Sequence, residues 1–251
     1  MTTKTALITG ATSGIGKAIA QHFAINGIQL VLCGRNAKVL EELKEDLSAH
    51  VPVHTLEFDV RDREMVTNQI ASIPETFNPI DILINNAGNA HGLDFIQEGS
   101  LDDWDAMIDI NVKGLLYVSK AIVPHMVVRK RGHIINIGST AGKEVYPKGN
   151  VYCASKHAVD AINQAMRIDL NAHNIRVGAI NPGMVVTDFS KVRFKGDTQR
   201  ADQVYQGFDC LQVEDIADIV HFVVTRPYHV NIADLVVLST AQASSTIINK
   251  G

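Results

Sequence analysis

The sequence predicts an α/β protein built on a doubly wound, parallel, seven-stranded sheet with helices on both faces. Short apolar runs alternate with longer amphipathic segments along the whole chain, a pattern typical of repeated βαβ units. The first apolar run leads directly into a glycine-rich turn. No internal repeat or Pro/Gly-rich linker divides the 251 residues, so we expect one domain over residues 1–251.

Seven apolar runs are expected to form the strands, because each is about the length of a buried parallel strand. They comprise residues 5–9, 28–33, 53–58, 80–84, 133–137, 175–180 and 235–238. Helical periodicity predicts helices over residues 16–25, 37–49, 61–72, 101–131, 151–172 and 213–225. The polar stretch 187–211 is weakly periodic. We expect it to lie over the sheet edge with little regular structure or as short helices.

Composition excludes several classes of protein. The net charge of −4 and the pI of about 6.2 disfavour a nucleic-acid-binding protein. Three cysteines without a CxxC pair, and ten scattered histidines, disfavour a disulfide framework and a metal site. No leader-like segment opens the chain and no apolar run reaches about 18 residues. We therefore expect a cytoplasmic protein without a membrane span.

A glycine-rich turn follows the first predicted strand. Gly10, Gly14 and Gly16 let the backbone turn sharply, and Thr12, Ser13 and Ile15 complete the turn. The N–H groups at the start of the next helix would then bind a pyrophosphate. The spacing is GxxxGxG rather than GxGxxG, and a turn without any ligand is the alternative. Its position after strand one favours a Rossmann-type dinucleotide site.

The end of the second predicted strand indicates the cofactor. An acidic residue there would select NAD through the ribose 2′-hydroxyl, but the sequence has Gly34-Arg35-Asn36. The fork of Arg35 matches a 2′-phosphate, which favours NADP(H). Alternatively, Arg35 stacks on the adenine or faces solvent. Asp59, after the third strand, would bind the adenine amino group or act as an ordinary helix cap.

A proton-transfer site is predicted at the start of the helix over 151–172. Tyr152 and Lys156 lie four residues apart, so they share one helical face, and an ammonium near a phenol lowers the phenol pKa. Taken alone, this spacing is more often a solvated face. Ser139 ends the fifth strand, where it would reach the same substrate oxygen. A buried Asn111 within the long helix would need a polar partner.

These motifs together resemble the short-chain dehydrogenase/reductase family. The resemblance spans nearly the whole chain and includes TGATSGIG, NNAG, Asn111, Ser139, YCASK and the NPGxxxT run that ends at Thr187. It implies hydride transfer between NAD(P) and a carbonyl/alcohol pair, and a homotetramer. By this resemblance Tyr152 is the acid/base, Lys156 lowers its pKa and binds nicotinamide ribose, Ser139 positions the substrate oxygen, and Asn111 supports a proton relay. Further cofactor positions are Val60, Asn85, Ala87, Gly88, Pro182, Gly183, Val185 and Thr187.

A closer likeness is to the NADP-dependent 3-hydroxy acid dehydrogenases, carried by residues 132–142, 149–152 and the FSKVRFKGD stretch. That likeness implies a small anionic hydroxy or oxo acid such as serine, 3-hydroxypropionate or malonic semialdehyde. Arg193 and Lys195 would clamp the acid group, with strand-like alternation placing both on one side, and Ala141 would also contact substrate. Both cations could instead face solvent or a neighbouring subunit. Sulfoacetaldehyde, a neutral carbonyl, or NADP(H) binding without turnover are the alternatives.

Overall fold

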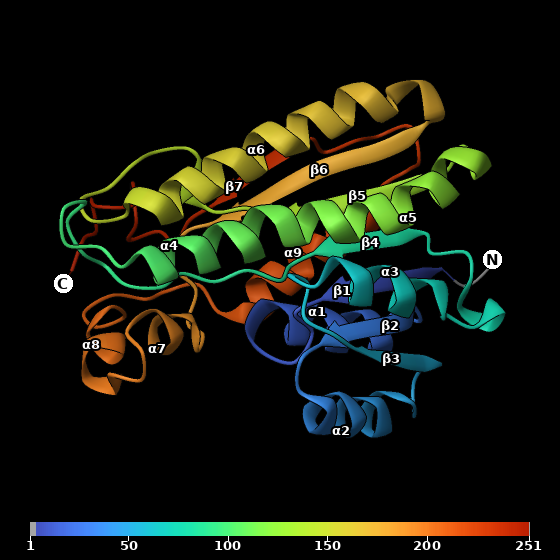
Figure 1. The fold of residues 1–251 in the computed structure, drawn as a ribbon, viewed down its shortest axis with the longest axis horizontal. Helices are drawn as coiled ribbons and strands as arrows, with labels where there is room; N and C mark the ends of the chain where they lie inside the picture. Colours follow the sequence, from blue (N-terminus) through green and yellow to red (C-terminus); the bar gives the residue numbers. More distant parts are fainter. Residues whose placement is uncertain (1–3, 251) are drawn as a thin grey trace.

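The computed structural model describes residues 4–250, and within this range one parallel sheet of seven strands forms the centre of the molecule (Figure 1). The strands are β1 (Thr5–Thr9), β2 (Gln29–Gly34), β3 (Val53–Glu57), β4 (Ile82–Asn85), β5 (Gly132–Ile137), β6 (Ile175–Pro182) and β7 (Asp234–Val237). They lie in the order β3-β2-β1-β4-β5-β6-β7. All seven predicted strands are confirmed, with bounds that differ by at most two residues.

Helices cover both faces of the sheet. Helices α1 (Gly14–Ile25), α2 (Ala37–Leu47) and α9 (Val213–Thr225) share one hydrophobic core with the sheet. Helices α3 (Arg63–Ala71), α5 (Leu115–Arg129) and α6 (Asn150–Leu170) share the core on the opposite face. Strand alternation divides the two cores: Ile8 belongs to the first and its neighbour Leu7 to the second. The predicted doubly wound architecture is confirmed.

The predicted long helix over residues 101–131 is interrupted. Helix α4 (Leu101–Ile108) passes into a wide π-helical turn, η2 (Asp109–Gly114), before α5 begins. A Cβ at Gly114 would lie 2.6 Å from a side-chain carbon of Val60, so the turn packs closely on the loop after β3. The side chain of Asn111 is held inside this turn by contacts to two other segments. Turns of this kind are frequent at functional sites.

Residues 187–211 contain two short helices, α7 (Phe189–Arg193) and α8 (Thr198–Gln203). They form a lobe beside the end of the sheet (Figure 1). The expected strand-like alternation of Arg193 and Lys195 is wrong, because Arg193 ends α7 and Lys195 has a left-handed φ of 53°. Over residues 4–250, no helix has both the length and the apolarity that a bilayer span requires.

Candidate active site

A cavity of about 540 Å³ opens at the carboxyl ends of the strands, between the sheet and the α7–α8 lobe. Ligands of open α/β sheets bind at this edge. Most predicted site residues line it. They are Gly10, Thr12, Ser13, Gly14, Ile15, Arg35, Asp59, Val60, Ala87, Gly88, Ser139, Ala141, Tyr152, Lys156, Pro182, Gly183, Val185, Thr187 and Arg193.

Four predicted site residues lie outside the cavity wall: Gly16, Asn85, Asn111 and Lys195. Asn85 belongs to β4, and its amide donates to Asn136 (2.9 Å) and Ser119 (3.0 Å) inside the core. Its neighbour Asn86 lines the cavity instead, because successive strand residues point to opposite sides. Gly16 packs against the glycine turn, and a Cβ at this position would clash with the carbonyl oxygen of Gly10.

The glycine turn leaves the start of α1 open to an anion. Gly10 has a φ of 64° and Gly14 a φ of 49°, which side-chain-bearing residues rarely adopt. Asn86 fixes the turn by donating to the carbonyls of Thr9 (2.9 Å) and Gly10 (3.2 Å). Ser13 makes no side-chain cap, and the first turn of α1 holds no acidic residue. The start of α1 therefore has no side-chain cap where it lines the cavity, and a helix start of this kind can bind an anion.

The second strand ends in an exposed arginine. The side chain of Arg35 is 64 % exposed, and its guanidinium lies 3.7 Å from Asp59 Oδ2. Asp59 is also held by Arg61, whose Nη2 lies 2.7 Å from the same oxygen. Burial raises the pKa of Asp59, but the hydrogen bonds and charge of Arg61 outweigh it and hold the pKa below its usual value. Arg61 was not predicted as a partner of Asp59, although it lies only two residues further along the chain.

Tyr152 lies in the first turn of α6 with its ring 5.5 Å from that of Phe189. Burial raises its pKa, and a neighbouring tyrosine, Tyr146, adds to this. The hydrogen bond with Ser139 and the charge of Arg193 lower it, but by less. The expectation that a nearby ammonium brings this pKa toward neutrality is wrong, because burial raises it. Here the loss of solvation of the phenolate dominates.

Lys156 follows one helical turn after Tyr152 and is buried. Its Nζ donates to the carbonyl of Ile137 at the end of β5 (3.0 Å). Burial lowers its pKa to about 8, because the charged form loses water. A Cβ at Gly88 would lie 3.0 Å from Asn111 Oδ1 and 3.6 Å from Lys156 Nζ. The Asn111 amide and the Lys156 ammonium therefore both lie close to the backbone of Gly88.

Asn111 joins three segments behind the cavity wall. Its Oδ1 accepts from the Asn89 N–H (2.9 Å), and its Nδ2 donates to the Asn89 carbonyl (2.8 Å). The same Nδ2 donates to Ser155 Oγ (3.0 Å) on α6. The polar partners predicted for a buried Asn111 are therefore present. They are structural partners, and they fix α6 relative to the loop after β4.

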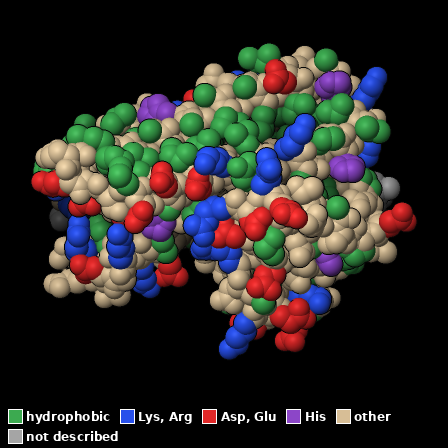
Figure 2. Space-filling view, viewed as in Figure 1, with side chains coloured by type: hydrophobic (Ala, Val, Ile, Leu, Met, Phe, Trp, Pro, Cys, Tyr) green, Lys and Arg blue, Asp and Glu red, His purple; other side chains and the backbone are tan. Residues whose placement is uncertain are grey.

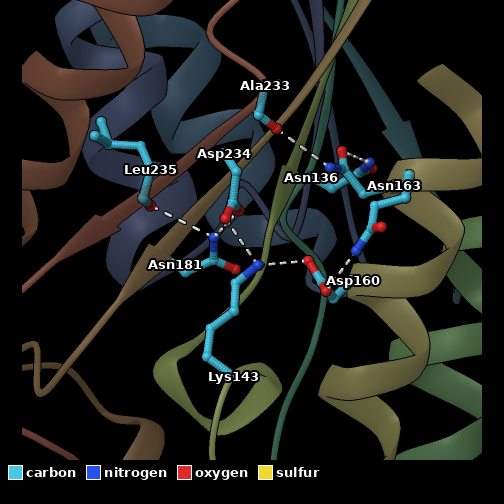
Figure 3. A network of polar contacts seen from close by, with 9 residues as sticks. Asn136, Lys143, Asp160, Asn163, Asn181, Ala233, Asp234 and Leu235 are labelled. Carbon is cyan, nitrogen blue, oxygen red and sulfur yellow. Dashed lines mark hydrogen bonds and ion pairs between the residues drawn. The ribbon is translucent and has the colours of Figure 1, made fainter.

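Ser139 begins a short 3₁₀ turn, η3 (Thr140–Gly142), and its Oγ accepts from the Ala141 N–H (3.1 Å). Lys143 follows and joins this turn to two other elements (Figure 3). Its Nζ lies 2.6 Å from Asp160 on α6 and 2.9 Å from Asp234 on β7. Asp234 also accepts from Asn181 Nδ2 (2.6 Å). The Lys143–Asp160 ion pair thus links the segment that follows Ser139 to α6, the helix that carries Tyr152.

The structure separates the two predicted anion-binding residues. Arg193 lines the cavity, and its guanidinium lies 5.3 Å from the Tyr152 ring centre. Among residues 4–250, no carboxylate lies within ion-pair distance of Arg193. Lys195 lies outside the cavity, is 63 % exposed and pairs with Asp103 (2.9 Å). Of these two residues, Arg193 is the one that offers an uncompensated charge to a bound anion.

Several residues of the substrate end of the cavity were not predicted from the sequence: Tyr146, Phe189, Tyr205 and Gln242. Gln242 comes from the C-terminal segment, and its Oε1 accepts from the Met184 N–H (2.9 Å). Nothing in its sequence context indicates this approach. Tyr146 lies in the loop between residues 142 and 149, and an aromatic residue in a loop carries no periodic signal.

Comparisons with known proteins agree with this geometry. The family model of the short chain dehydrogenases matches residues 4–198. The NADP-dependent 3-hydroxy acid dehydrogenase YdfG of Salmonella typhi is 44% identical over 238 residues, covering 94% of this chain and 95% of that protein. Sulfoacetaldehyde reductase 2 of Chromohalobacter salexigens is 43% identical over 240 residues, covering 95% of each chain.

Solved structures show the same relationship. The closed form of a serine dehydrogenase complexed with NADP+ superimposes with a TM-score of 0.92 at 43% identity, covering 96% of this chain and 97% of that one. Serine dehydrogenase from Escherichia coli has a TM-score of 0.83 at 38% identity, covering 95% and 99%. The sequence match, the shared fold and the arrangement of Ser139, Tyr152 and Lys156 together lead to one conclusion: the chain belongs to the short-chain dehydrogenase family.

Proposed function

We propose that the protein transfers a hydride between NADP(H) and a small 3-hydroxy acid or its 3-oxo acid, such as serine, 3-hydroxypropionate or malonic semialdehyde. The observation that carries this proposal is the place of Arg193. Its guanidinium faces the cavity without a carboxylate partner among residues 4–250, next to the ring of Tyr152. A half-buried, unpaired guanidinium beside a proton donor suits a substrate with an acid group.

The residues at the other end of the cavity fit a phosphorylated dinucleotide. The turn of Gly10 and Gly14 and the uncapped start of α1 would hold the pyrophosphate. Arg35, which is exposed at the end of β2, would hold the 2′-phosphate. The 44% identity to an NADP-dependent dehydrogenase supports the same cofactor. When bound, NADP(H) supplies or accepts the hydride.

Tyr152 would exchange the proton at the substrate oxygen. Its raised pKa keeps the phenol protonated at neutral pH, which suits donation to a carbonyl oxygen during reduction. In oxidation the same group takes the alcohol proton. Ser139 would hold the substrate oxygen beside the phenol, since both side chains line the same cavity. Lys156, in its charged form, would favour the phenolate, and Asn111 would support the proton path through the backbone it fixes.

The remaining cofactor and substrate contacts follow from the lining of the cavity. We propose that Val60, Asp59, Ala87 and Gly88 contact the adenosine and ribose end. Pro182, Gly183, Val185 and Thr187 would flank the nicotinamide, and Ala141 would contact the substrate. The domain would act as a single unit over residues 1–251, with 187–211 as its substrate loop. Lys195 contributes to that loop by pairing with Asp103 rather than with substrate.

A kinetic panel tests the proposal. Serine, 3-hydroxypropionate, malonic semialdehyde, sulfoacetaldehyde and a neutral aldehyde are assayed with NADP(H) and NAD(H) by absorbance of the reduced nicotinamide. We expect the highest kcat/KM for a carboxylate substrate with NADP(H). A sulfonate is the second candidate, because a guanidinium also binds sulfonate and the 43% identical relative is named a sulfoacetaldehyde reductase. A preference for the neutral aldehyde would contradict the acid-binding role. No turnover with any of these substrates would contradict the proposed hydride transfer.

We also propose a cytoplasmic homotetramer. Hydrophobic side chains gather over α4, α5 and α6 in the space-filling view (Figure 2). Exposed apolar residues of these helices include Leu101 on α4 (69 % exposed), Val128 on α5 (84 %) and Ile168 on α6 (75 %). Exposed apolar area of this kind is typical of subunit interfaces. Light scattering after size-exclusion chromatography measures the mass, and a monomer at micromolar concentration would contradict this assembly.

A further inference from the structure

Tyr146 holds a fixed position between η3 and α6. A Cβ at Gly149 would lie 2.5 Å from a ring carbon of Tyr146 and 2.8 Å from Cys153 Sγ. The ring therefore packs directly on the backbone at Gly149, next to the thiol of Cys153. Burial raises the pKa of Tyr146, so its hydroxyl stays protonated and neutral. The hydroxyl lies in the wall of the substrate end of the cavity.

This hydroxyl is the side-chain partner of Arg193. Nη2 of Arg193 donates to the Tyr146 hydroxyl oxygen (2.8 Å), and Nε donates to the Gly92 carbonyl (3.2 Å). The Arg193 carbonyl in turn accepts from the Gly92 N–H (2.9 Å). The guanidinium carbon lies 5.6 Å from the Tyr146 ring centre and 5.3 Å from that of Tyr152. Arg193 is thus held against both phenol rings.

These contacts leave the charge of Arg193 free for a ligand. A guanidinium has five N–H donors, and the contacts to Gly92 and Tyr146 use two of them. Both partners are neutral, so neither compensates the charge. Arg193 ends a helix of five residues, and a long side chain on so short an element loses much rotamer freedom on binding a ligand unless other groups already order it.

We propose that Tyr146 is a specificity-determining residue that positions Arg193 for the acid group of the substrate. Its hydroxyl fixes the plane of the guanidinium, so that the remaining N–H donors face a carboxylate beside Tyr152. Acid preference then depends on Tyr146 and Arg193 together. Tyr146 acts through Arg193 and contributes nothing to the binding of a neutral substrate. This inference rests on the acid-binding role proposed above for Arg193.

The test compares two substrates that differ in one group: 3-hydroxypropionate and its uncharged analogue 3-hydroxypropionamide. Tyr146→Phe keeps the ring and removes the hydroxyl. We expect the KM for the acid to rise about 10-fold, the size of one lost hydrogen bond to a charged group. We expect kcat for the acid, and KM for the amide, to change less than about twofold. A merely structural role would move both substrates alike.

A double variant shows whether Tyr146 acts through Arg193. In the Arg193→Ala background, Tyr146→Phe should no longer change the KM for the acid, because the residue it positions is gone. An effect that persists undiminished in that background overturns the proposal. So does a lower KM for the acid in Tyr146→Phe, since the hydroxyl would then compete with the substrate for the guanidinium.

A matched control variant and the Arg193→Ala variant distinguish a failure of the Tyr146 inference from a failure of the proposed function. Tyr228→Phe removes another phenol with hydrogen bonds, to Asn174 and Gly132, at the opposite edge of the sheet. It should leave both KM values unchanged. If Arg193→Ala itself leaves the KM for the acid unchanged, the acid-binding role of Arg193 fails. If Arg193→Ala raises that KM and Tyr146→Phe does not, only the inference about Tyr146 fails.

Discussion

Lys143 Nζ lies 2.6 Å from Asp160 Oδ1, and this ion pair joins the loop after Ser139 to the helix that carries Tyr152. Asp160 lies two turns after Tyr152, on the face of α6 that also presents Lys156. A Cβ at Gly142 would lie 2.6 Å from the Lys156 carbonyl oxygen. The loop and the helix backbone are therefore in direct contact, and the ion pair fixes them at that spacing.

Lys143→Met should weaken this connection. Asp160 is 19 % exposed and Asp234 is 45 % exposed, and both lose the cation between them. We expect a loss of about 1–2 kcal/mol in the free energy of unfolding, less than for a fully buried pair. A lower kcat should accompany it, because Ser139 would be less well placed. Denaturant titration and steady-state kinetics measure the two effects.

Two controls support the Lys143 experiment. Lys143→Arg keeps the charge and should restore most of the stability. Lys38→Met removes a lysine that is 86 % exposed and pairs with Glu42 on the surface, so its effect should be close to zero. Equal losses in Lys143→Met and Lys38→Met would show that the ion pair has no special role.

Tyr152→Phe should abolish turnover and leave NADPH binding intact. The substitution removes the proton donor but keeps a ring that packs on Phe189. Loss of general acid/base catalysis costs about 10²–10⁴-fold in rate. Single-turnover absorbance measures the chemistry, and isothermal titration measures the cofactor affinity. Turnover within about twofold of the parent protein would rule out Tyr152 as the acid/base.

Arg35→Ser should reduce the preference for NADP over NAD. The side chain is 64 % exposed, so a phosphate contact there is partly screened by solvent. We expect the KM for NADP to rise about 10- to 100-fold while the KM for NAD stays within about threefold. Asp59 and Arg61 keep their own ion pair in this variant. Parallel changes for both cofactors would show that Arg35 does not contact the 2′-phosphate.

The lowered pKa of Lys156 should make the free energy of unfolding depend on pH. Burial lowers its pKa to about 8, below the value of 10.5 for a free lysine. Between these two values the unfolded chain binds more protons than the folded one, so this group makes stability rise with pH from about 8 to about 10.5. Below pH 8 the full penalty of the buried charge is present. Lys156→Met should therefore be more stable than the parent protein at pH 7.

The measurement is the difference in free energy of unfolding between Lys156→Met and the parent protein, without cofactor, from pH 6.5 to 9.5. The gain of the variant should be on the order of 2 kcal/mol at pH 7, as expected for a charge removed from a buried site. It should shrink as pH rises above 8. The contributions of groups that do not interact with Lys156 cancel in this difference. A constant or growing gain would contradict the lowered pKa.

The fold and the cofactor end of the cavity were predictable because they depend on local patterns. Each strand is a short apolar run. The turn from Gly10 to Gly16 needs glycines because a Cβ would clash there, and the glycines are visible in the sequence. Family resemblance supported Asn111 and Ser139, and the partners of Asn111 come from distant segments. The side-chain directions were less predictable. Asn85 was expected to line the cavity, but its alternation along β4 turns it into the core.

The substrate end was predicted least well, since it is built from tertiary contacts between loops. Arg193 and Lys195 are two residues apart, and strand geometry would place them together. The backbone is instead helical through Arg193 and left-handed at Lys195. A buried phenol also reversed the expected pKa shift of Tyr152, because the cost of desolvation depends on packing that no spacing reveals.

The wide turn η2 has a consequence for how this chain tolerates changes in length. An α-helix advances about 100° per residue, so one extra residue in a π-helical turn rotates everything after it by that angle. Helix α4 packs on α6, whereas α5 packs on α3 and β4. Removing one residue from 109–114 would restore a regular helix but rotate one of these faces away from its partner. Surface loops tolerate single-residue insertions and deletions, whereas this turn should not.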